Sequence, residues 1–246
     1  ANSMQNEKND YKFFSDTKHI DVDRLTPKHT VYLTGGEPAV MREVYDFMQH
    51  CIDRGRTDFT FTLPSNVQSL NNKFLSLAKQ FKHMHFSVSI DGYGAVNDYV
   101  RWRTNWKTVE ENLHRIRNEG ILFSWNHVPT IWGIHRTHEL FEFASETFPQ
   151  SPLYLQYDRV DLHSAFRSPL VKETLESLER CKKTRLYWSD GKDCRSGIDS
   201  FYNHYQSYIP DKEHLKKFFD WNDKMDNARN IKMADYIPEL AACNPN

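Results

Sequence analysis

The sequence has little of what marks secreted, membrane-spanning or nucleic-acid-binding proteins. Its four cysteines are widely and irregularly spaced, which fits neither a disulfide framework nor a compact zinc site. No run approaches the roughly 18 apolar residues that span a bilayer, and the chain shows no signal-peptide pattern. The 32 Lys and Arg residues nearly balance the 33 Asp and Glu residues, so no global field steers the chain to anions. We therefore expect a cytoplasmic protein that does not bind a membrane, and the near-zero net charge argues against nucleic acid as its partner.

What is present points to a folded α/β protein. The 246 residues suffice for one α/β domain or two small ones. A content of 39% hydrophobic and 14% aromatic residues indicates a globular chain, although the mean hydropathy of −0.74 is polar. From His29 onward, patterns typical of strands alternate with patterns typical of amphipathic helices. Strands are expected over 29–34, 57–63, 83–91, 121–131 and 151–160, and helices over 40–54, 69–81, 104–120 and 137–148.

This alternation also suggests how the chain is organised. Short connections between strands and helices predict parallel βαβ units, either in an open doubly wound sheet or in part of a (β/α) barrel. A polar lead-in covers residues 1–28, an α/β core covers 29–163, and a C-terminal extension covers 164–246. Within the extension we expect a helix over 168–188, a polar turn over 189–193 and a helical stretch over 210–225.

The two faces of the predicted strands favour the barrel. Alternate side chains of strand 83–91 are apolar on one face (Met84, Phe86, Val88, Ile90) and polar on the other (His85, Ser87, Ser89, Asp91). A parallel strand between two layers of helices would be apolar on both faces. The polar face therefore fits a partly open barrel lumen that is lined for a polar ligand, the alternative being an exposed sheet face. Polar residues gather toward the carboxyl ends of the strands, where α/β folds bind ligands.

One motif stands between a predicted strand and the helix that follows it: Thr34-Gly35-Gly36-Glu37-Pro38. The glycines let the backbone approach a ligand closely, Glu37 offers a carboxylate, and Pro38 suits the first turn of a helix. Taken alone, a Gly-Gly sequence before a helix is usually only a turn. It lacks the spacing of a nucleotide phosphate loop.

Further motifs in the same order carry a family resemblance. The GGEP sequence, a strand that ends near Asn66, and a strand that ends in Ser89-Ile90-Asp91-Gly92 together resemble the radical S-adenosylmethionine (radical SAM) superfamily. The resemblance runs from about residue 31 to 113. Segments 97–101 and 105–113, and more loosely Asp226, Arg229 and segment 236–240, resemble members that carry a twitch-type C-terminal extension.

The resemblance implies a fold and a set of binding residues. The fold is α/β, a partial (β/α)6 TIM-like barrel with a small C-terminal extension. Eight positions are implied to bind S-adenosylmethionine (SAM): Gly35, Gly36, Glu37, Pro38, Asn66, Ser89, Asp91 and Arg101. Their chemistry suits the ligand, because a carboxylate and backbone carbonyls accept from the ammonium and a guanidinium fork pairs with the carboxylate. The alternatives are a surface ion pair for Arg101, turn capping for Asn66 and Ser89, and a turn with Gly92 for Asp91.

The sequence departs from this family in its cysteines. The family holds a [4Fe-4S] cluster on three thiolates spaced CxxxCxxC, and this chain contains no such motif. We expect the chain to be a piece of a longer enzyme that lacks the first strand and the cluster loop, so its cluster ligands would lie outside it. Cys181 and Cys194 are weak candidates for an auxiliary cluster, although free buried thiols are the more ordinary interpretation. The histidines lack metal-binding spacing and are interpreted as surface or strand residues.

Three functional hypotheses follow. The first is a segment of a radical SAM enzyme that generates a 5′-deoxyadenosyl radical and abstracts hydrogen, with a peptide or small-molecule substrate and an electron donor such as a flavodoxin or ferredoxin. The second is a degenerate, non-catalytic barrel that acts as a binding or interaction module. The third hypothesis is a nucleic-acid-modifying member, because segment 102–107 holds both basic and aromatic residues.

Overall fold

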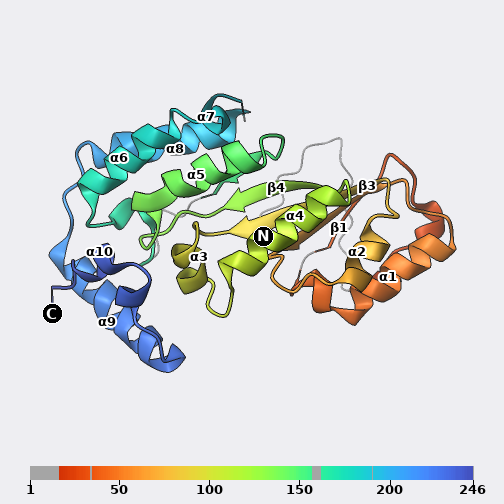
Figure 1. Ribbon diagram of the computed structural model, residues 1–246, viewed down its shortest axis with the longest axis horizontal. Helices are drawn as coiled ribbons and strands as arrows, with labels where there is room; N and C mark the ends of the chain where they lie inside the picture. Colours follow the sequence, from red (N-terminus) through yellow and green to blue (C-terminus); the bar gives the residue numbers. More distant parts are fainter. Residues whose placement is uncertain (1–16, 34, 157–161, 190, 246) are drawn as a thin grey trace.

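Five parallel strands form the centre of the protein. The computed structural model describes residues 17–33, 35–156, 162–189 and 191–245. The strands are β1 (Thr30–Tyr32), β2 (Thr60–Ser65), β3 (His83–Ile90), β4 (Leu122–His127) and β5 (Leu153–Leu155), and they pair side by side in the order β1-β2-β3-β4-β5 (Figure 1). A doubly wound sheet reverses its strand order at a switch point, whereas this order never reverses. The predicted α/β fold of partial-barrel type is therefore confirmed.

Helices connect and flank the strands. The α-helices are α1 (Arg42–Asp53), α2 (Asn72–Ala78), α3 (Ala95–Val100), α4 (Trp106–Asn118), α5 (Thr137–Thr147), α6 (Val171–Cys181), α7 (Arg185–Ser189), α8 (Gly191–Tyr205), α9 (Lys212–Arg229) and α10 (Pro238–Ala241). The short 3₁₀ helices are η1 (Thr17–His19), η2 (Val22–Arg24), η3 (Pro38–Val40), η4 (Ile134–Arg136), η5 (Ala165–Arg167) and η6 (Met233–Asp235). None of these described helices is both long and apolar enough to cross a membrane.

The two faces of the sheet differ as their sequence period predicts. On one face, aromatic side chains pack against the helices: Phe61 meets Phe47 of α1 at 5.6 Å between ring centroids, and Trp125 meets Phe143 of α5 at 6.2 Å. Residues on this face of β3 are buried, whereas His85, Ser87 and Ser89 on the other face are half-buried. The main hydrophobic core therefore lies between the sheet and the helices, and the polar face looks the other way.

Capping side chains fix several helix ends. The Asn71 side chain accepts from the Phe74 N–H at the start of α2, and the Asn105 side chain accepts from the Thr108 N–H at the start of α4. Gly120, with φ of +73°, follows the end of α4, which confirms it as the expected C-terminal cap.

The C-terminal extension differs from its prediction in two places. The expected helix over 168–188 is interrupted between α6 and α7, where the Thr184 hydroxyl donates to the Cys181 carbonyl at 2.8 Å. The predicted polar turn over 189–193 is wrong from Gly191 onward, because α8 begins there. The physical reason is the helical spacing of the buried residues that follow, which are Cys194, Ile198, Phe201 and Tyr205.

The bounds of three predicted strands also differ. The strand predicted over 121–131 ends at His127, and the one predicted over 151–160 spans Leu153–Leu155 and ends before Gln156, while its residues from 157 onward lie outside the described part of the chain. The strand predicted over 29–34 spans Thr30–Tyr32, with Thr34 likewise outside it. Sequence reasoning also missed α3 altogether, although that helix adjoins the candidate site.

A second hydrophobic cluster joins α3 to the end of the chain. It contains Val96, Tyr99, Ile131, Trp132, Leu170, Leu215, Phe218, Phe219, Met233, Ile237 and Leu240. Figure 1 shows α9 and α10, in dark blue, beside α3, whereas α6 and α8 lie in a separate layer outside α5. The C-terminal segment thus packs on two different parts of the α/β core.

The approach of α3 to the sheet depends on glycine. A Cβ placed on Gly92 would lie 2.5 Å from Val96 Cγ1, and one on Gly133 would lie 2.8 Å from the same atom. Val96 is 1% exposed, so it cannot swing aside into solvent. Gly92 is therefore required for close packing, which the predicted turn at Asp91-Gly92 did not anticipate.

We expect Gly92→Ala to destabilise the protein by about 1–3 kcal/mol, because the added methyl overpacks the contact with Val96. The cost should be smaller in a Val96→Ala background, measured as a double-mutant cycle from denaturant unfolding. Gly36→Ala is the control, since a Cβ there would meet only Met41 Sδ at 3.6 Å. Equal costs in both backgrounds would contradict this account of α3 packing.

Candidate functional site

The residues that the sequence singles out follow successive strands at one edge of the sheet. Because β1 to β4 are parallel, the loops after them emerge at the same edge, which is where α/β folds bind ligands. Gly35 to Pro38 come after β1, Asn66 after β2, and Asp91 after β3. Arg101 ends α3 and reaches back to this edge through Asp91.

Glu37 joins the loop after β1 to the end of β2. Its half-buried carboxylate accepts from the Ser65 hydroxyl at 2.5 Å through one oxygen and from the Asn66 N–H at 2.9 Å through the other. An ionised carboxylate offers about four lone-pair sites, so both oxygens can still accept a further donor. Glu37 thus holds the loop in place while keeping capacity for a ligand cation.

The turn after β2 explains most of what Ser65 and Asn66 do. The Ser65 hydroxyl accepts from the Val67 N–H at 2.9 Å, and the Asn66 side-chain oxygen accepts from the Gln68 N–H at 2.9 Å. Asn112 of α4 donates to the Val67 carbonyl at 2.7 Å. The bond to Gln68 is the turn-capping role that was the alternative for Asn66, and it leaves the side-chain NH₂ of Asn66 to donate to other acceptors.

The backbone conformation favours glycine at Gly35 but not at Gly36. Gly35 has φ of +142°, a conformation that other residues rarely adopt, and nothing lies within 4 Å of a Cβ built there. The ordinary contact of a Gly36 Cβ with Met41 means that packing does not require glycine at that position. Pro38 is buried and starts η3, as expected from its lack of an N–H.

Asp91 and Arg101 bind each other. Arg101 Nε lies 2.9 Å from Asp91 Oδ2, and its Nη2 donates to Asp91 Oδ1 at 3.2 Å. The Arg101 side chain is 27% exposed and the Asp91 side chain 14% exposed, so the pair is partly shielded from water. Both partners had been assigned to SAM on resemblance. The ion pair is the alternative that the sequence left open for Arg101, although it lies at the strand ends and not on the open surface.

Ser89 has a neighbour that the sequence analysis overlooked. Ser89 of β3 and Asn126 of β4 are partners in the parallel ladder and share the polar face of the sheet. Asn126 Oδ1 is buried and accepts no hydrogen bond within the described residues. The signal was available, because the period-2 pattern that places Ser89 on this face also places Asn126 there.

His127, the next residue, is a buried neutral imidazole. It is 1% exposed, and its Nδ1 lies 3.0 Å from the Ile90 carbonyl, so this nitrogen carries the proton and donates. Nε2 has no hydrogen-bond partner within the described residues. Burial lowers the pKa of His127 to about 4.

His127 is a strand residue, which agrees with the sequence, but the interpretation of the histidines as surface or strand residues is wrong for His135. This residue is 4% exposed, and its Nε2 lies 2.8 Å from Glu239 Oε1 of α10. Burial lowers the pKa of His135 even though the Glu239 carboxylate opposes the shift.

His127 should make stability depend on pH. Its imidazole takes up a proton near pH 6.5 when unfolded but only near pH 4 when folded, so the unfolded chain binds more protons between these values. This contribution is complete above pH 6.5 and is lost as pH falls, by about 3 kcal/mol over the window. In His127→Gln, the free energy of unfolding, measured by urea titration from pH 7 to 4, should fall less steeply. An unchanged slope would count against a buried neutral His127.

The described cysteines do not fit an iron–sulfur cluster. Cys51, Cys181 and Cys194 are buried without measurable exposure, and only Cys243 is partly accessible. Burial raises the pKa of Cys51 to about 12 and that of Cys181 well above its ordinary value, so both thiols stay protonated. No group of three or more potential metal ligands occurs among the residues that the structure describes.

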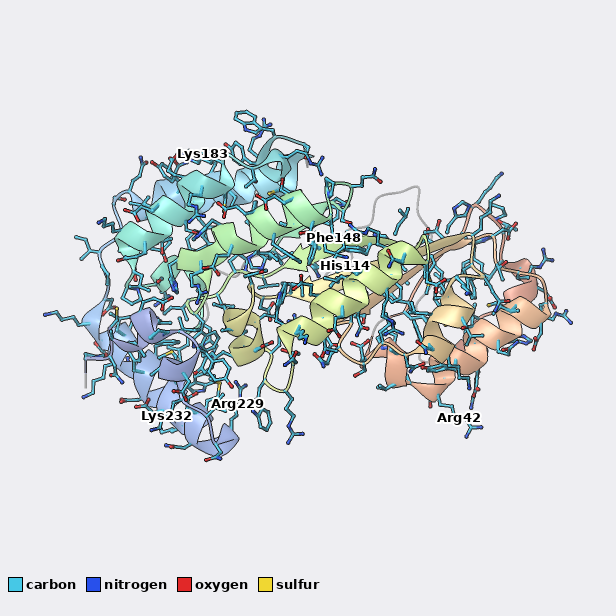
Figure 2. All side chains as sticks on the ribbon, viewed as in Figure 1. Arg42, His114, Phe148, Lys183, Arg229 and Lys232 are labelled. Carbon is cyan, nitrogen blue, oxygen red and sulfur yellow. The ribbon has the colours of Figure 1, made fainter. Side chains whose placement is uncertain are left out.

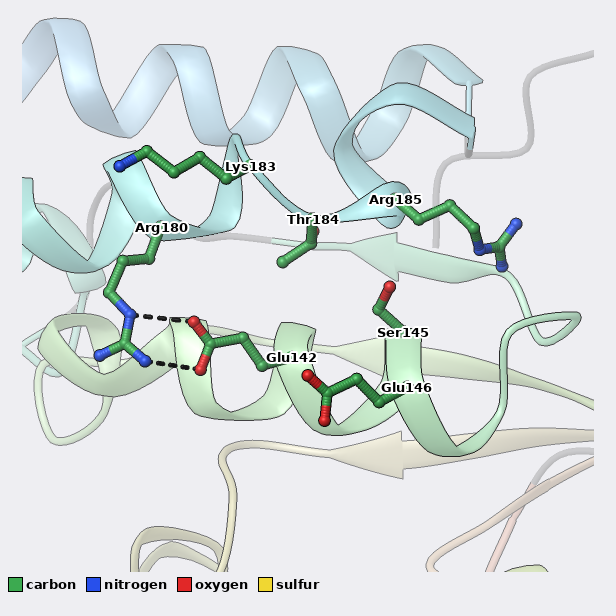
Figure 3. Close-up of a pocket in the computed structure, with 7 residues that line it drawn as sticks. All are labelled: Glu142, Ser145, Glu146, Arg180, Lys183, Thr184 and Arg185. Carbon is green, nitrogen blue, oxygen red and sulfur yellow. Dashed lines mark hydrogen bonds and ion pairs between the residues drawn. The ribbon is translucent and has the colours of Figure 1, made fainter.

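A surface cavity of about 420 Å³ lies elsewhere, between α5 and the α6–α7 connection. Arg180 crosses it to Glu142 with two bonds of 2.9 and 2.6 Å, while Arg185 points away from that pair (Figure 3). Its lining residues are Glu142, Ser145, Glu146, Arg180, Lys183, Thr184 and Arg185. This open, charged groove holds none of the residues that the sequence singled out.

Comparison with solved structures gives likenesses at low identity. A structure of anSMEcpe with bound AdoMet and the Cp18Cys peptide covers 65% of this chain and 47% of that chain, at 13% identity and a TM-score of 0.49. The match to Streptococcus suis SuiB bound to S-adenosylmethionine covers 63% of this chain and 35% of the SuiB chain, at 15% identity and a TM-score of 0.44. The match to a domain of pyruvate-formate lyase-activating enzyme from Bacteroides vulgatus covers 62% of this chain and 92% of that domain, at 12% identity and a TM-score of 0.45.

These likenesses carry no argument about function, because their TM-scores and identities are low. What anSMEcpe and SuiB bind is a property of those proteins, and this chain matches just under half the length of that anSMEcpe chain. No protein-family model matches the sequence, and no curated protein matches it.

Proposed function

We propose that the chain binds SAM at the carboxyl-end edge of β1 to β4, as the SAM-binding part of a radical SAM enzyme. The observation that carries the proposal is the pairing of Ser89 with Asn126, whose buried Oδ1 accepts no hydrogen bond within the described residues, on the polar face of the sheet. An unused buried acceptor is costly unless something donates to it. Glu37 and Arg101 lie at the same edge of the sheet and add one charge of each sign.

The ammonium, the ribose and the carboxylate of SAM would each have a matching group in this arrangement. The ammonium would meet Glu37 and the backbone beside it, where Gly36 leaves room for close approach. A ribose hydroxyl would donate to Asn126 Oδ1, with Ser89 as its neighbour. The Pro38 ring would hold the glycine turn and contribute no hydrogen bond of its own, since it lacks an N–H.

Arg101 would bind the SAM carboxylate by exchange. Its guanidinium already pairs with one carboxylate, that of Asp91, and a second carboxylate would share or replace it. Replacing one acceptor by another of the same charge avoids leaving the guanidinium unpaired, which would be the costly outcome in a partly shielded site. Asp91 would then be the residue that keeps Arg101 oriented before SAM arrives.

The proposal extends to the reaction class but not to its cluster chemistry. Radical SAM enzymes generate a 5′-deoxyadenosyl radical for hydrogen abstraction, and a peptide or small-molecule substrate with a flavodoxin or ferredoxin as electron donor belongs to this proposal. The described cysteines do not fit a [4Fe-4S] cluster or an auxiliary one. The contribution that we assign to this chain is therefore to bind and orient SAM.

Two substitutions test SAM binding with little effect on folding. Gly36→Ala should weaken SAM binding at least tenfold, because the methyl occupies the space where the ligand approaches, while stability changes by no more than about 0.5 kcal/mol. Ser89→Ala should weaken it about threefold to tenfold, the effect of losing one hydrogen bond between the Ser89 hydroxyl and the ribose or carboxylate of SAM. Ser87→Ala is the matched control, since Ser87 lies on the same face of β3, two positions before Ser89 and farther from the edge.

The measurement is equilibrium dialysis of the chain with labelled SAM, with thermal unfolding of each variant alongside. Wild-type protein that retains no labelled SAM would contradict the proposal. That outcome would favour the second candidate function, a non-catalytic barrel. The bonds by which Glu37, Asp91 and Arg101 already satisfy each other and their loops are the observation behind that candidate. Equal losses in the Ser87 and Ser89 variants would also count against a site at the edge.

A further inference from the structure

Tyr99 of α3 is fully buried and yet makes polar contacts with α9. Its hydroxyl lies 2.6 Å from Asp226 Oδ1 and 2.8 Å from Asn222 Oδ1. A hydroxyl has one proton to donate, and the closer, charged carboxylate is the stronger acceptor. The Asn222 oxygen is already used by the Trp132 indole N–H at 2.9 Å. The Tyr99 hydroxyl therefore donates its proton to Asp226, and Asn222 lies beside it while accepting from Trp132.

Asp226 ties Tyr99 to the end of the chain. Its second oxygen accepts from the Met233 N–H of η6 at 2.6 Å, and the residue is 8% exposed. Arg229, which is labelled in Figure 2, donates to the Tyr99 carbonyl at 3.3 Å. A buried carboxylate that loses one of its partners is left with an uncompensated charge, so this contact constrains the position of Tyr99 strongly.

The opposite side of α3 contacts the candidate site. The Asn97 side-chain oxygen accepts from the Asp91 N–H at 3.3 Å, and the Asn97 carbonyl accepts from the Arg101 N–H at 2.8 Å. Val96 packs against Gly92, the residue after Asp91. Hence α3 lies between the Asp91–Arg101 pair on one side and the buried carboxylate of α9 on the other.

The length of α3 matters here. The helix has six residues, which is too short to be stable in isolation, so packing and hydrogen bonds to its neighbours set its position. A directional bond to a buried charge fixes orientation more closely than apolar packing does. The contacts of Tyr99 therefore set the backbone position of Arg101, two residues later, from which its side chain extends to Asp91.

We propose that Tyr99, Asn222 and Asp226 are positioning residues, through which α9 holds α3 and with it the Asp91–Arg101 pair. The effect on the ion pair stands on the geometry of this chain alone. The effect of this positioning on ligand affinity rests on the proposed SAM site. The alternative is that the three residues only stabilise the second hydrophobic cluster, in which case their loss would lower stability and leave Arg101 unchanged.

The test is Tyr99→Phe, which keeps the ring in the cluster and removes the hydroxyl. Its control is Tyr187→Phe, because the Tyr187 hydroxyl donates to Asp199 Oδ1 at 2.9 Å between α7 and α8, away from the site. Arg229→Gln is a second variant on the same path. Arg229 is only partly buried, so this substitution should leave the fold intact while removing the bond to the Tyr99 carbonyl.

Two quantities are measured for each variant of the full chain. One is the NMR resonance of the Arg101 Nε–Hε group without ligand, assigned with Arg101→Lys. The other is the dissociation constant of SAM. We expect Tyr99→Phe to shift or broaden the Arg101 resonance and to weaken SAM binding about threefold or more. Arg229→Gln should act in the same direction and by less, and Tyr187→Phe should leave both quantities unchanged.

Some outcomes would overturn the proposal. One is that the Arg101 resonance and the SAM affinity of Tyr99→Phe are the same as in the wild type. The other is that both change no more than they do in Tyr187→Phe at a similar loss of stability. If Tyr99→Phe does not fold, an unchanged resonance in Arg229→Gln overturns it instead. If the wild type binds no SAM, the proposed function fails, and the Arg101 resonance alone still decides whether α9 positions the pair.

Discussion

The parallel pairing of β1 to β4 is the constraint on which the rest of the structure depends. It brings three loops that are far apart in sequence to one edge of the sheet, and its two-residue period keeps one face apolar and the other polar. The apolar face binds the helices and supplies the free energy of the main core. The polar face and the loops at its edge are left to carry chemistry, which is where Ser89 and Asn126 lie side by side.

The charged groups at this edge are already engaged with one another. Glu37 links the loop after β1 to the end of β2, and Arg101 pairs with Asp91 after β3. Such bonds hold the loops in position before any ligand arrives, which lowers the entropic cost of binding. They also mean that a ligand must compete for Arg101, so the strength of the Asp91–Arg101 pair would influence affinity. The contact of α9 with Tyr99 places that pair under the control of the C-terminal segment.

Patterns with a local physical cause could be predicted from the sequence. The period of 83–91 gave the two faces of β3, and Gly120 marked the end of α4, since both follow from backbone geometry. Gly191 to Asp193 look like a turn because Gly and Asp favour turns. The buried residues that follow them override that preference and make the segment the first turn of α8. The short helix α3 has too few residues for a clear period, so the pattern could not reveal it.

Tertiary pairing explains what the sequence could not supply at the site. Nothing local shows that Arg101 meets Asp91 or that His127 is buried. These facts depend on which loops the sheet brings together. Asn126 is the exception, because the period that identified Ser89 applies equally to its neighbour in β4.

The most direct measurement is hydrogen–deuterium exchange of the whole chain with and without saturating SAM. The account predicts slower exchange at the edge of the sheet, in segments 35–37, 65–68 and 91–101 together, because one ligand would contact all three loops. Exchange in α6, α7 and α8 should stay the same. Unchanged exchange at the edge, or protection confined to the groove between α5 and α6–α7, would contradict the central claim that these loops form one SAM site.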